Sequence, residues 1–119
     1  MLEIEFLKRD IKKFGIEEFA KKFKPAFVKF MDAFKINTES RTRADWNKET
    51  KIGEDLAFSL YNSKEFAKKY AGVYRDMLSG FHTLLFNSRE MKSLPSDMSE
   101  FKKLLEAYEV AYETRELWP

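Results

Sequence analysis

Apolar residues recur along the chain with the period of a helix, and they predict its elements in order. Ile4, Leu7 and Ile11 are spaced by three and four residues, which predicts a short amphipathic helix ended by Gly15. A stripe of phenylalanine follows. At 100° per residue its five rings fall within about 80° of a helix surface. The members are Phe19, Phe23, Phe27, Phe30 and Phe34.

Pro25 interrupts the phenylalanine stripe. Proline lacks the backbone N–H that a helix interior needs, so we expect a helix that is kinked at Pro25 or broken into two. The pattern then lapses over residues 36–51, where small polar residues dominate. We predict a loop there, with room for a helical turn near Asp45, followed by a short helix that buries Ile52 and Leu56.

The longest helix is predicted at about residues 63–91. Asn62 with Glu65 resembles a capping box, nine apolar side chains share one face, and Ser79–Gly80 is a place where the helix could bend. A last helix is expected at about 97–117, capped by Asp97 and stopped from joining its predecessor by Pro95. No segment alternates as a strand does. The sequence therefore predicts an all-α fold, an irregular bundle of about five helices in which 63–91 and 97–117 are longest.

Composition narrows the class of protein. A chain of 119 residues forms one domain, residues 1–119, and buries a core without cross-links. The absence of cysteine excludes disulfides and thiolate metal sites and favours a reducing, cytoplasmic location. The acidic N-terminal residues do not resemble a signal peptide, and the apolar runs are too short to span a membrane. We expect no metal and no cofactor, because the sequence has one histidine and no phosphate-binding glycine loop.

Charge is unevenly distributed. Residues 1–92 carry 19 Lys and Arg against 14 Asp and Glu, whereas residues 93–119 carry 3 against 6. Within the long helix a basic row is expected opposite the apolar face, within about 60° of the surface. Such a row either follows a phosphate backbone or simply solvates an exposed face. Its members are Lys64, Lys68, Arg75, His82 and Arg89.

The polar segment before residue 52 is a second candidate binding site. It contains Arg41, Arg43, Trp46 and Lys48, and arginine and tryptophan are enriched both at protein interfaces and where bases stack. The alternative is that Trp46 tucks into the core and fixes the segment. The last helix carries an acidic row of the opposite charge, which either pairs within the fold or attracts a basic partner. That row is Glu106, Glu109, Glu113 and Glu116.

No pattern in the sequence indicates catalysis. His82 has no carboxylate three or four positions away, and the acidic pairs at 17–18 and 54–55 point in different directions on a helix. We therefore expect a non-catalytic interaction protein that docks on a larger protein or assembly, or on further copies of itself. Accessory and regulatory proteins of phages and mobile elements share this size and helical character. The alternative is a helical subunit of a ribonucleoprotein or DNA-processing complex that binds nucleic-acid backbones without sequence preference.

Overall fold

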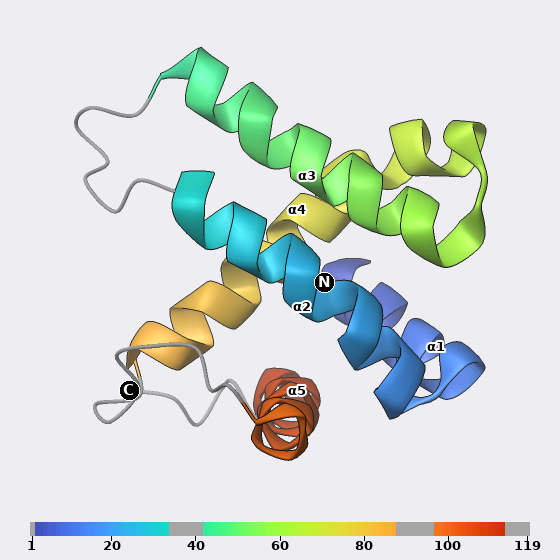
Figure 1. Cartoon of the computed structure of the whole chain (residues 1–119), viewed down its shortest axis with the longest axis vertical. Helices are drawn as coiled ribbons and strands as arrows, with labels where there is room; N and C mark the ends of the chain where they lie inside the picture. Colours follow the sequence, from blue (N-terminus) through green and yellow to red (C-terminus); the bar gives the residue numbers. More distant parts are fainter. Residues whose placement is uncertain (1, 34–41, 88–96, 114–119) are drawn as a thin grey trace.

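The computed structural model describes residues 2–33, 42–87 and 97–113, and these residues form five α-helices and no strand. The predicted all-α fold is confirmed. Figure 1 shows α2 crossing the middle of the molecule, with α3 and α1 on one side of it in this view and α5 on the other. The helices are α1 (Leu2–Phe14), α2 (Ile16–Ala33), α3 (Arg43–Tyr61), α4 (Lys64–Asn87) and α5 (Met98–Glu113).

The phenylalanine stripe forms the centre of the core. Phe19, Phe23, Phe27 and Phe30 are all fully buried, as the helical period predicts, whereas Phe34 lies outside the described residues. Gly15 separates α1 from α2 with a φ of 85°, a conformation that glycine adopts at no steric cost. Pro25 lies inside α2 on its exposed side, and the helix continues through it rather than breaking.

The predicted loop over residues 36–51 is wrong from residue 43 onward, because α3 begins there. Thr42 caps it: its hydroxyl accepts from the backbone N–H of Asp45 at 3.2 Å, and the Asp45 carboxylate accepts from the Thr42 N–H at 3.0 Å. With 19 residues α3 is longer than the described 16 residues of α5. The helical pattern is weak in sequence because the buried positions here include Glu49 and Gly53.

A two-residue link joins α3 to α4. Asn62 ends α3 in the left-handed conformation, with a φ of 52°. Ser63, rather than Asn62 as expected, caps α4 by accepting from the N–H of Phe66 at 3.1 Å. The bend in α4 also differs from the expected place: its backbone leaves helical geometry at Tyr70, not at residues 79–80. The short link and the kink bring the first half of α4 against α3 (Figure 1).

A buried polar cluster ties α1 to α3 and α4. Asp10 is fully buried and accepts hydrogen bonds from the hydroxyls of Tyr61 and Tyr74. Arg9 lies 3.6 Å from the same carboxylate, and its guanidinium covers the Phe6 ring at 4.1 Å. Burial, and then the hydrogen bond to Asp10, raises the pKa of both tyrosines, so their hydroxyls remain protonated donors. The cluster is therefore a satisfied structural network.

Candidate protein-docking surface

Trp46 is held at the surface of α3. It lies one turn after the Thr42 cap, and 45% of its surface is exposed. This answers the question that the sequence left open, because a tryptophan that fixed the segment from inside the core would be covered. Large exposed aromatic surface costs free energy in water unless a partner covers it.

Arg75, from α4, holds the tryptophan ring in place. Its guanidinium carbon lies 4.5 Å from the centre of the Trp46 ring, a cation–π distance. The same guanidinium donates to the Thr50 hydroxyl at 2.9 Å and pairs with Asp76 at 3.0 Å. Only 17% of the Arg75 side chain is exposed. Trp46 of the predicted polar segment and Arg75 of the predicted basic row are therefore in direct contact.

Arg43 completes this surface. It lines a shallow hollow of about 300 Å³ together with Trp46, and it is exposed. We call the surface formed by Arg43, Trp46, Thr50 and Arg75 the Trp46 face. It combines a fixed aromatic ring, one exposed guanidinium and one shielded guanidinium, which is the composition of interface hot spots.

Lys64 and Lys68 lie at the start of α4, before Arg75, beside a second hollow of about 170 Å³. The hollow also contains Phe58, which is 38% exposed and which the sequence did not single out. Phe58 was missed because it precedes the helix end and breaks the apolar period. The two lysines are exposed, as the basic row predicts.

The remaining predicted residues do not join the Trp46 face. Lys48 is exposed on α3, but at 100° per residue it projects about 160° away from Trp46. Arg41 and Arg89 lie outside the described residues, so their part in either surface stays a prediction.

The expected position of His82 in the basic row is wrong. His82 is 8% exposed, and its ring lies 6.4 Å from Phe27 and 6.2 Å from Phe30, both on α2. The sequence places it opposite the apolar face of α4, but α2 crosses that side of the helix and covers it. Burial lowers the pKa of His82, so the row loses one of its expected cations.

The lowered pKa of His82 makes stability fall on acidification. The unfolded chain binds a proton near the ordinary histidine pKa of about 6.5, whereas the folded chain binds it only at lower pH. The free energy of unfolding should therefore be constant above that value and decrease below it. Urea denaturation between pH 7.5 and 5.5 measures the slope. The variant His82→Gln should lose most of this dependence on pH. Equal slopes in the natural chain and in the variant would contradict the assignment of the dependence to His82.

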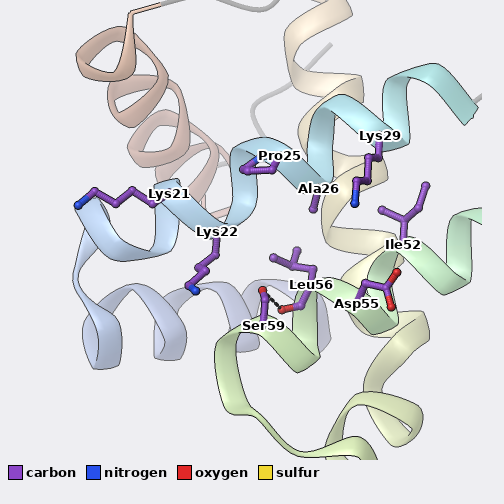
Figure 2. A pocket seen from close by; sticks show the side chains of 9 residues that line it. All are labelled: Lys21, Lys22, Pro25, Ala26, Lys29, Ile52, Asp55, Leu56 and Ser59. Atoms are coloured by element: carbon purple, nitrogen blue, oxygen red, sulfur yellow. Dashed lines mark hydrogen bonds between the residues drawn. The ribbon is translucent and has the colours of Figure 1, made fainter.

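The sequence also missed a groove between α2 and α3. The pattern of one helix cannot show which neighbouring helix lies beside it. The groove has a volume of about 330 Å³ and an apolar floor (Figure 2). Its lining includes none of the residues of the Trp46 face, so the two surfaces are separate.

Within residues 2–33, 42–87 and 97–113, no three His, Asp or Glu side chains are grouped so that they could hold a metal ion. None of the described helices combines the length and apolar character that crossing a bilayer requires. No protein-family model, curated protein or solved structure matches the chain.

Proposed function

We propose that this chain is a non-catalytic interaction protein that docks on a larger protein through the Trp46 face. The observation that carries the proposal is the exposed Trp46 ring fixed by Arg75. Because the ring is already held by the guanidinium, little side-chain entropy is lost when a partner covers it. The proposal includes a cytoplasmic, accessory or regulatory role, consistent with a chain that has no cysteine to oxidise.

The state of Arg75 favours a protein partner over nucleic acid. Its charge is paired with Asp76, and one face of its guanidinium is occupied by Trp46. A cation engaged in this way has little capacity left to neutralise a phosphate. The same contacts support a protein interface, where a shielded arginine stiffens the aromatic anchor beside it.

Binding to nucleic-acid backbones remains the alternative, and the exposed Arg43, Lys64 and Lys68 are the observation that favours it. It predicts salt-sensitive binding to any DNA or RNA, with a slope that falls when Lys64 and Lys68 are replaced by glutamine. The protein-docking proposal predicts no binding to generic duplex or single-stranded probes at 50 mM salt, whatever their sequence. A fluorescence anisotropy titration across a salt series distinguishes the two.

Truncating the tryptophan tests the main proposal. Trp46→Ala should weaken partner binding at least about 30-fold, the effect of losing a hot spot worth about 2 kcal/mol. The tagged chain is recovered from cells that naturally express it, after nuclease treatment, and the retained proteins are quantified. Leu2→Ala is the control, because Leu2 is 51% exposed on α1, away from this surface.

One protein should be retained by the natural chain and by Leu2→Ala and lost with Trp46→Ala. Retention that is equal in all three would show that the Trp46 face is not the docking surface. Circular dichroism of Trp46→Ala guards against unfolding, and we expect an unchanged helical spectrum because the ring lies outside the core.

A further inference from the structure

The groove between α2 and α3 has the shape and charge of a docking site for a helix. Ala26 from α2 and Ile52 and Leu56 from α3 form its floor, and Figure 2 shows them facing one another across the gap. Ile52 and Leu56 are almost completely buried, so the floor is continuous with the core. Ala26 is only partly buried, so it is the part of the floor that offers apolar surface to a side chain from outside.

Cations line the α2 side of this groove. Lys22 and Lys29 are exposed at its edge, on either side of Ala26 (Figure 2), and neither pairs with an acidic side chain among the described residues. The third lysine, Lys21, pairs with Glu18 at 3.4 Å. On the α3 side stands Asp55, which holds Lys51 at 3.3 Å. The groove is therefore complementary to an apolar residue flanked by carboxylates that face α2.

The outer surface of α5 carries that pattern. Val110 is 57% exposed, more than any other large apolar side chain that the structure describes. Glu106 is exposed one turn before it, and Glu109 adjoins it. We call Glu106, Glu109 and Val110 the α5 ridge. Lys103 lies one further turn back on the same side of the helix, where it would face the acidic side of the groove.

We propose that the α5 ridge of one copy docks in the α2–α3 groove of a second copy. Val110 covers Ala26 and the floor, and Glu106 meets Lys22. The spacings agree: Glu106 and Val110 are four residues apart on α5, and Lys22 and Ala26 are four apart on α2, about 6 Å along each helix. The contact places the carboxylate of Glu106 against the ammonium group of Lys22, and it buries the otherwise exposed Val110.

This contact is head-to-tail, because the ridge and the groove are different surfaces. Each copy then offers one of each, so association proceeds to a ring or an open chain rather than stopping at a symmetric dimer. A single helix in a groove of about 330 Å³ forms a small interface, which places the association in the weak, concentration-dependent class. The inference goes beyond the proposed function and does not depend on the Trp46 face.

Two variants used alone and together test the proposal. The groove variant carries Lys22→Glu and Lys29→Glu, and the ridge variant carries Glu106→Lys and Glu109→Lys. Sedimentation velocity of the natural chain should show mass rising with concentration towards 1 mM. Each variant alone should associate at least about tenfold more weakly, since like charges then face each other. An equimolar mixture should recover association, because each variant supplies the intact surface that the other lacks.

A second pair of variants controls for net charge. One control protein carries Lys12→Glu and Lys64→Glu, and the other carries Glu5→Lys and Glu17→Lys. These exposed positions lie outside the groove and the ridge, and the changes in net charge equal those of the groove and ridge variants. Each control protein alone should associate as the natural chain does, and so should Trp46→Ala, which separates this proposal from the proposed function. A natural chain that stays monomeric at 1 mM overturns the proposal. So does a groove or ridge variant that associates normally, or a mixture that recovers nothing.

Discussion

Replacing Phe81 by alanine should lower the free energy of unfolding by about 4 kcal/mol. Phe81 is fully buried in α4, and its ring packs edge-on against Phe23 at 5.2 Å and Phe27 at 4.9 Å. It also packs against the rings of Phe101 and Tyr108 of α5, with ring centres 5.5 and 5.8 Å from its own. Truncation therefore leaves a cavity where α2, α4 and α5 meet, and the rigid rings around it cannot collapse to fill it.

Phe58→Ala is the matched control for Phe81→Ala. Phe58 is the same residue type, but it is 38% exposed on α3. Its truncation should cost below about 1 kcal/mol, since little buried area is lost. Urea denaturation gives both values. Equal losses, or a loss below about 1 kcal/mol for Phe81→Ala, would mean that the Phe81 ring is not enclosed by α2 and α5 as described.

Replacing Gly53 by alanine should destabilise the fold by about 2 to 3 kcal/mol, although alanine is a better helix former than glycine. A Cβ there would lie 2.5 Å from the carbonyl oxygen of Ala71 and 2.6 Å from the backbone nitrogen of Arg75. Both are backbone atoms of α4, so the helices themselves must separate. Because Arg75 holds Trp46, the same substitution should also increase the mobility of that ring.

Gly72→Ala on the facing helix is the control for Gly53→Ala. The Cβ there would meet only the Arg75 guanidinium, at 3.6 Å, which is ordinary contact. Alanine should therefore stabilise α4 by about 0.5 to 1 kcal/mol through its higher helix propensity. Opposite signs for the two substitutions are expected in thermal or urea denaturation. A stabilising Gly53→Ala would contradict the close approach of α3 and α4.

The sequence predicts the fold well where one apolar face dominates a helix. The phenylalanine stripe places α2 correctly, since four rings at helical spacing leave no other arrangement that buries them all. The prediction from sequence fails at the start of α3. Glu49 and Gly53 are buried there, and a pattern of apolar residues does not mark glutamate or glycine as buried positions. The Thr42–Asp45 capping box was the local signal that could have located this helix.

The candidate sites depend on how helices neighbour one another, which is information that no single helix pattern holds. Trp46 and Arg75 were each singled out from sequence, but their contact needs the two-residue link at Asn62 and the close approach at Gly53. His82 has the right angle on α4 for an exposed row, yet α2 covers it. The lysine-lined groove likewise exists only because α3 lies beside α2.

Site-specific photo-crosslinking at the Trp46 face tests the central claim most directly. A photoreactive amino acid replaces Asn47, which is exposed next to Trp46, and a second protein carries it at the exposed Lys12 of α1. Both are irradiated in cells that naturally express the chain. We predict one dominant protein adduct from position 47 that disappears with Trp46→Ala and has no equivalent at position 12. An adduct with nucleic acid at position 47, or no adduct there, would contradict a protein-docking role for this surface.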